Sequence, residues 1–93
     1  ALAREGVRAV RLPVAAAFHS PLVADAEGPF HAAMAGIAFL PGKPVFANTT
    51  AQPYPDDVAG TLAGQLARPV EWVRLVRAMH AAGARTFVEV GPG

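Results

Sequence analysis

Residues 15–23 read AAAFHSPLV and place one histidine, His19, between a small apolar run and the expected start of a helix. Ser20 followed by Pro21 is typical of a helix N-cap with proline at the first helical position, where the missing N–H costs nothing. An imidazole titrates near neutral pH, so a histidine fixed at such a junction can accept a proton and return it. The stretch therefore predicts a helix start with a candidate general base beside it.

His19 also has a purely structural interpretation, in which the ring only packs, and spacing alone favours that role. Its neighbour Ser20 is predicted to be structural, because adjacent side chains diverge and an N-cap hydroxyl is committed to backbone N–H groups. The chain contains no GxSxG motif, the turn that presents a nucleophilic serine. If His19 is a base, its nucleophile is expected on sequence outside these residues.

The segments around this stretch predict alternating strands and helices. Partial alternation of apolar residues favours a strand over 7–12, and the helix from Pro21 carries an apolar stripe that Pro29 should divide. Further along we expect a short strand over 45–47, a helix with Asp56 and Asp57 in its first turn that runs to about residue 67, a helix from Pro69 to a stop at Gly83, and a strand over 86–90. This order predicts an α/β fold with parallel neighbouring strands.

The composition is unusually apolar for a small domain, with 53% hydrophobic residues among 93. Small domains bury proportionately little of their surface, so this much apolar sequence requires a covering partner. Residues 1–5 read as the end of a helix already under way, and the closing Gly-Pro-Gly reads as a turn that leads onward. We therefore expect the chain to be a piece of a larger fold.

Charge and cysteine content narrow the function classes. The formal charge of +1, from 8 Lys and Arg against 7 Asp and Glu, provides no basic field, so no nucleic-acid partner is expected. The lack of cysteine excludes disulfides, thiolate metal sites and a thiol nucleophile. No run approaches the length of a membrane span and no signal peptide is visible, so we expect no membrane partner and a cytoplasmic location.

The histidines lack the paired spacing of metal ligands, and no metal site is expected. His31 and His80 fall in amphipathic helical segments, where a filler role is favoured over function. The terminal Gly-Pro-Gly has neither GxGxxG spacing nor a following helix, so it is not interpreted as a phosphate loop.

Four stretches together resemble a known family. In order and approximate spacing, AAFHSPLV at 16–23, VFANTTA at 45–51, GQLARPVEW at 64–72 and AAGARTFVEVGPG at 81–93 are similar to the C-terminal part of malonyl-CoA:acyl-carrier-protein transacylases and polyketide synthase acyltransferase domains. The sequences of the first and last stretches are most similar to those of acyltransferases of iterative polyketide synthases, including the enediyne and polyunsaturated-fatty-acid types.

The resemblance implies an α/β-hydrolase-like core with an inserted ferredoxin-like subdomain. Residues 1–12 would be the last helix and strand of the small subdomain, and residues 13–93 the C-terminal part of the large one. The serine elbow, the arginine that pairs with the malonyl carboxylate and the oxyanion donor would all lie upstream. The chain alone is then expected to be inactive.

The resemblance also implies a ping-pong acyl transfer. A serine would accept malonyl from coenzyme A and pass it to the phosphopantetheine thiol of an acyl carrier protein, with His19 as general base. The imidazole would be oriented by a backbone carbonyl near Gln65, which makes Gln65 an orienting candidate. A polar residue that only ends a helix is an equally good interpretation of Gln65. Asn48 matches an asparagine near the site, and we favour a structural hydrogen-bonding role for it. Malonyl-CoA and the carrier would be substrates, with no bound cofactor.

Substrate choice is suggested by AAFH at residues 16–19, which resembles the HAFH pattern of malonyl selection more than the YASH pattern of methylmalonyl selection. Phe18 would crowd the space that an α-methyl group needs. One methyl group in a pocket is worth only about 1 to 3 kcal/mol, so the preference would be incomplete. Ala16 departs from both patterns.

A different class of function fits the same sequence. In this alternative the chain is a non-catalytic α/β module that docks a partner protein through its apolar surface, with Trp72, Phe30 and Met79 as anchors. These three side chains are more simply explained as core residues.

Overall fold

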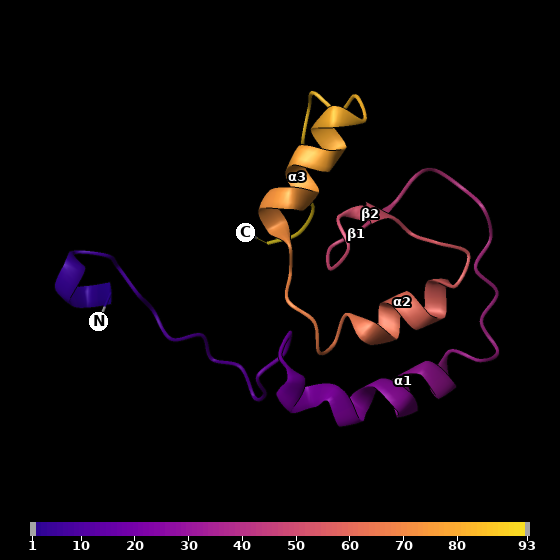
Figure 1. The fold of residues 1–93 in the computed structure, drawn as a ribbon, viewed down its shortest axis with the longest axis horizontal. Coiled ribbons are helices and arrows are strands. Elements are labelled where there is room, and N and C mark those ends of the chain that lie inside the picture. The colour runs from indigo at the N-terminus through magenta and orange to yellow at the C-terminus, as the bar shows by residue number, and fades with distance from the viewer. Residues whose placement is uncertain (1, 93) are drawn as a thin grey trace.

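The structure is a computed structural model that describes residues 2–92. Its elements are the 3-10 helices η1 (Leu2–Glu5) and η2 (Pro21–Ala26), the α-helices α1 (Glu27–Ala33), α2 (Val58–Gly64) and α3 (Trp72–Ala81), and the strands β1 (Phe46–Ala47) and β2 (Gln52–Pro53). Helix α1 packs along α2, and α3 contacts β1 on the other side of the small hairpin (Figure 1). The N-terminal segment extends away from this group.

The helix predicted from Pro21 is confirmed, with Ser20 as its N-cap. The Ser20 hydroxyl oxygen accepts from the Leu22 N–H at 3.4 Å, and the hydroxyl donates to the Ala17 carbonyl at 2.6 Å. Pro29 was expected to bend or restart the helix near Phe30, but the helical run instead changes from η2 to α1 at Glu27 and continues through Pro29. Proline cannot donate to a helical hydrogen bond, and this change puts Pro29 in the first turn of α1, where no donor is needed.

The strand predicted over 45–47 is confirmed as β1, and it pairs antiparallel with β2 in the register Phe46 to Pro53 and Ala47 to Gln52. Strand β2 was not expected, because Pro53 cannot donate to a ladder. The pairing continues past the proline through the Tyr54 N–H, which donates to the Val45 carbonyl at 2.9 Å.

Two helix starts differ from prediction. Asp57 is the N-cap of α2, accepting from the Gly60 N–H at 3.0 Å, and not part of its first turn; α2 ends at Gly64 and a turn follows to residue 67. Helix α3 begins at Trp72 instead of Pro69, because the Glu71 N–H donates to the Asn48 carbonyl at 2.7 Å and anchors the connection to the hairpin. The predicted stop at Gly83 is confirmed by its φ of 114°.

The strands predicted over 7–12 and 86–90 are not formed, and within residues 2–92 the only sheet is the antiparallel pair β1–β2. The expectation of parallel neighbouring strands is therefore wrong for this chain taken alone. A strand needs a neighbour to pair its N–H and C=O groups, and none lies beside either segment. Their large side chains remain in solvent, with Val10 69% and Val90 94% exposed.

The core is small for the length of the chain. The buried apolar residues of the described chain are two larger ones and four alanines: Met34, Leu75, Ala47, Ala51, Ala63 and Ala67. The accessible surface is 7671 Å², against about 5,100 Å² for a compact protein of this mass. The radius of gyration is 16.1 Å, against about 12 Å for a compact domain of this length. The helices therefore leave much apolar surface uncovered.

None of the helices that the structure describes combines the length and the apolar character needed to cross a bilayer.

Candidate functional site

His19 occupies a strained position at the entry to η2. Its φ of 62° lies in the left-handed region, which is uncommon for residues other than glycine and costs of order 1 to 3 kcal/mol. The His19 N–H donates to the Leu66 carbonyl at 2.8 Å, joining segments far apart in the sequence. This hydrogen bond helps to hold a backbone conformation that the free chain would disfavour.

The ring of His19 is held by Gln65, the residue before Leu66. Nδ1 lies 2.9 Å from the Gln65 carbonyl oxygen. A carbonyl can only accept, so the proton of the neutral ring is on Nδ1 and the lone pair is on Nε2. The residue is exposed. The arrangement thus presents a basic nitrogen of fixed tautomer on the molecular surface.

The two acceptors come from the end of α2. The last carbonyls of a helix have no partner within the helix, so they are free to accept from elsewhere. Gln65 is the C-cap residue, and its own N–H is used by the Thr61 and Leu62 carbonyls. Ending α2 at this point supplies both carbonyls that hold His19.

Sequence analysis missed one residue of this group, Tyr54. The side-chain amide of Gln65 donates to the Tyr54 hydroxyl oxygen at 2.5 Å, in a half-buried contact. The sequence indicates Gln65 as an orienting candidate or a plain polar residue at a helix end, and no spacing rule connects a residue after β2 with the end of α2. Only the packing of the hairpin against that helix end reveals the contact.

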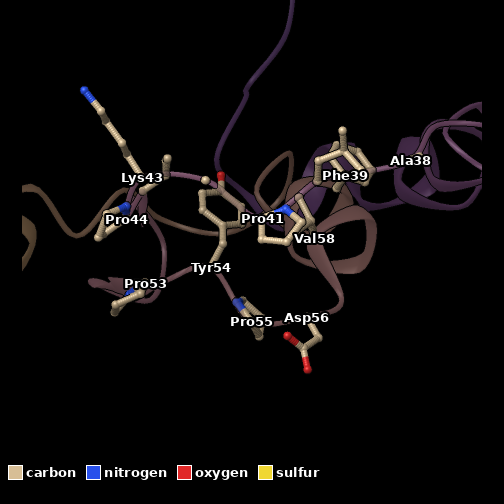
Figure 2. Close-up of a pocket in the computed structure, with 13 residues that line it drawn as sticks. Ala38, Phe39, Pro41, Lys43, Pro44, Pro53, Tyr54, Pro55, Asp56 and Val58 are labelled. Atoms are coloured by element: carbon tan, nitrogen blue, oxygen red, sulfur yellow. The ribbon is translucent and has the colours of Figure 1, made fainter.

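Tyr54 also lines an open hollow of about 680 Å³, formed by residues 38–45, residues 53–56 and Val58. Figure 2 shows Tyr54 near the middle of this lining, with Pro41, Pro53 and Pro55 around it. His19 is not among the lining residues. The Tyr54 ring therefore faces the hollow, and the Tyr54 hydroxyl contacts Gln65, whose carbonyl holds His19.

The proposed selectivity residues are placed differently from one another. Phe18 is 54% exposed and does not line the hollow beside Tyr54. Ala16 is half-buried and lines a second, shallower space of about 480 Å³ with Arg11, Leu12 and Val14. The structure does not bring Phe18 and Ala16 together with Gln65 around one cavity.

Asn48 contributes through its backbone. Its carbonyl accepts from the Glu71 N–H, while its side-chain Oδ1 and the neighbouring Thr49 Oγ1 are buried without a hydrogen-bond partner among residues 2–92.

The remaining histidines lie apart from the site. His31 and His80 are exposed, on α1 and α3. In the part of the chain that the structure describes, no three side chains of the metal-binding types gather.

Comparison with known proteins gives close matches over most of the chain. No family model matches it. It is 42% identical over 86 residues to the polyketide biosynthesis protein ThaF of Burkholderia thailandensis, a match that covers 90% of this chain and 8% of the relative. It is 37% identical over 94 residues to one component of the polyunsaturated fatty acid synthase of a Thraustochytrium species, covering 98% of this chain and 3% of the relative.

A solved structure agrees with these relatives. The malonyl CoA-acyl carrier protein transacylase of Burkholderia pseudomallei superposes with a TM-score of 0.82 at 34% identity, over 90% of this chain and 31% of the transacylase. The chain thus spans less than a tenth of the two relatives and about a third of the transacylase.

Proposed function

Because this chain matches the C-terminal part of malonyl-CoA:acyl-carrier-protein transacylases and polyketide synthase acyltransferases, which have an α/β fold, we propose that it is part of such an acyltransferase. It would move malonyl from coenzyme A, through a serine ester, to the phosphopantetheine thiol of an acyl carrier protein in polyketide biosynthesis. The observation that carries the proposal is the 2.9 Å contact between His19 Nδ1 and the Gln65 carbonyl, which leaves the Nε2 lone pair free.

In the first half-reaction the serine lies on the N-terminal part of the same domain. Nε2 of His19 takes the serine hydroxyl proton as the oxygen attacks the malonyl thioester carbonyl. The tetrahedral intermediate collapses to the serine ester, and the departing coenzyme A sulfur takes the proton from Nε2. The Gln65 carbonyl accepts from Nδ1–H throughout, so it stabilises the imidazolium and keeps the ring oriented.

In the second half-reaction the same nitrogen serves the carrier. Nε2 takes the proton of the phosphopantetheine thiol, and the thiolate sulfur attacks the ester carbonyl. When the intermediate collapses, the serine oxygen leaves and recovers the proton from Nε2. The ring ends in its starting state, as a ping-pong cycle requires.

The uncovered surface supports an obligate partner. The surface in excess of a compact protein is about 2,600 Å². A typical reversible protein complex buries only about 800 Å² on each side. We propose that the N-terminal part of the domain covers this surface, and that the chain alone is inactive because the serine lies there.

The rival docking module has one observation in its favour, since its anchors Trp72 and Phe30 are 64% and 39% exposed. The size of the uncovered surface favours a permanent neighbour within one fold over a reversible partner. A GHSxG segment in the preceding sequence supports the enzyme, and its absence supports the docking module.

The test of the proposed function is His19→Ala in the complete acyltransferase domain, assayed by malonyl transfer from malonyl-CoA to the carrier protein. Loss of a positioned general base should lower kcat by about 10² to 10⁴. His31→Ala is the matched control, since His31 is an exposed histidine on α1, and it should keep the parent rate. Undiminished transfer by His19→Ala would remove His19 from the mechanism.

A further inference from the structure

We propose that Tyr54 is a positioning residue for His19, acting through Gln65. The inference rests on the proposed function, because it assigns a role within the same site. Tyr54 does not touch His19; its hydroxyl holds the Gln65 side chain, and Gln65 presents the carbonyl that holds the imidazole.

The position of Tyr54 is set by the hairpin. Its N–H donates to the Val45 carbonyl at 2.9 Å, directly after β2. The flanking Pro53 and Pro55 each fix one backbone φ angle, so few conformations are open to this segment. Tyr54 is half-buried, and its ring lies along the hollow of Figure 2. The backbone that carries the Tyr54 hydroxyl is therefore restrained.

Gln65, by contrast, lies where regular structure stops. It is the C-cap of α2: its N–H donates to the Thr61 and Leu62 carbonyls, and its carbonyl lies past the last helical residue, Gly64. Among the described residues, the Gln65 side chain makes its hydrogen bond with the Tyr54 hydroxyl. The Tyr54 hydroxyl thus restrains Gln65. Gln65 carries one of the two carbonyls that hold His19, and the next residue, Leu66, carries the other.

Two hydrogen bonds on consecutive residues depend on this restraint. The Gln65 carbonyl receives Nδ1–H of His19 at 2.9 Å, and the Leu66 carbonyl receives the His19 backbone N–H at 2.8 Å. The second bond supports the left-handed backbone of His19. If the Gln65 peptide moves, the ring loses the acceptor that sets its tautomer, and the proton can shift to Nε2, which then cannot act as a base.

This chain of contacts predicts a specific kinetic signature. The chemical steps use Nε2, whereas binding of malonyl-CoA does not depend on the ring tautomer. In the complete domain, Tyr54→Phe removes the hydroxyl and keeps the ring, so kcat should fall roughly three- to tenfold, the range for one lost hydrogen bond. The KM for malonyl-CoA should stay within about twofold of the parent.

The matched control is Thr50→Val in the same hairpin. The Thr50 hydroxyl oxygen accepts from the Gln52 N–H at 3.3 Å, so this variant also removes a local hydroxyl contact, but one with no connection to Gln65. It should keep the parent kcat. Gln65→Ala retains the backbone carbonyl and removes the amide, and it should lower kcat as much as Tyr54→Phe does. The double variant should be no slower than either single one, because both remove the same contact.

A spectroscopic readout separates positioning from general loss of structure. Long-range ¹H–¹⁵N correlations of the imidazole report which ring nitrogen carries the proton. In the parent domain His19 should show one tautomer, protonated on Nδ1, and Tyr54→Phe should show a mixture with the Nε2 form, while Thr50→Val resembles the parent.

The outcomes distinguish the inference from the proposed function. If His19→Ala is inactive but Tyr54→Phe keeps both the parent kcat and a single tautomer, the role of Tyr54 is refuted and the acyltransferase proposal stands. If His19→Ala transfers malonyl at the parent rate, the proposed function itself fails. If kcat falls equally in Tyr54→Phe and Thr50→Val with an unchanged tautomer, Tyr54 is merely structural and the inference is overturned.

Discussion

At the scale of single residues, the conformation of His19 depends on its two hydrogen-bond acceptors more than on its neighbours in sequence. Its left-handed φ of 62° is stabilised by the Leu66 carbonyl, and its ring by the Gln65 carbonyl. In the proposed mechanism, a backbone carbonyl would take the place of the aspartate of a serine-hydrolase triad, because it accepts from Nδ1–H without adding a charge. The orientation of the His19 ring thus depends on where α2 ends.

The proposed preference for malonyl also rests on one residue. Phe18 directly precedes His19, and we expect Phe18→Ser in the complete domain to open space for an α-methyl group. The ratio of kcat/KM for malonyl-CoA over methylmalonyl-CoA should then fall, by no more than about 10- to 200-fold, the worth of one methyl group in a pocket. Both substrates are measured with the same carrier protein.

The control for this prediction is Leu22→Ser, which removes an exposed apolar side chain of η2 close to His19 in sequence. It should leave the ratio unchanged. An unaltered ratio in Phe18→Ser would mean that Phe18 does not border the acyl group.

At the scale of elements, local capping rules account for the helix boundaries on which the site depends. Ser20 and Pro21 begin η2 directly after His19, and Asp57 caps the start of α2, which ends at Gly64 with Gln65 as its C-cap. Each cap satisfies backbone N–H groups that a helix start leaves without partners. Shifting either boundary by one residue would move the imidazole or its acceptor.

The Asp57 cap makes a prediction about stability. Asp57→Ala removes the acceptor of the Gly60 N–H and should lower the free energy of unfolding of the complete domain by about 1 kcal/mol, within a range of about 0.5 to 2. Asp56→Ala is the neighbouring control, because no cap hydrogen bond involves its side chain in α2. Urea unfolding at constant m-value measures both, and equal effects of the two variants would refute the cap assignment.

At the scale of the whole molecule, the described chain exposes more surface than a compact protein of its mass. Its small core consists of four alanines with Met34 and Leu75, while Val10 and Val90, in segments 7–12 and 86–90, stay in solvent. Strands there would need neighbours that residues 2–92 do not provide. The uncovered surface and the unpaired segments therefore point to the same requirement, a permanent neighbour.

This requirement can be tested on the 93-residue chain itself. We expect the isolated chain to bind a dye for exposed apolar surface and to unfold without a sharp transition, since so little is buried. The complete domain should bind little dye and unfold cooperatively. Two-state unfolding of the isolated chain, with the m-value of a compact domain of this length, would contradict the proposal.

Beyond the resemblance to the acyltransferases, the sequence alone determined features that depend on neighbouring residues: the cap at Ser20 and Pro21, the strand β1 and the stop at Gly83. These follow from local hydrogen bonding and backbone limits, which act over a few residues. Tertiary structure alone decided that β2 pairs despite Pro53, that segments 7–12 and 86–90 remain unpaired, and that Tyr54 reaches Gln65. Each of these depends on which distant segment lies alongside, because a strand or a side-chain amide is satisfied only by a partner brought to it through packing.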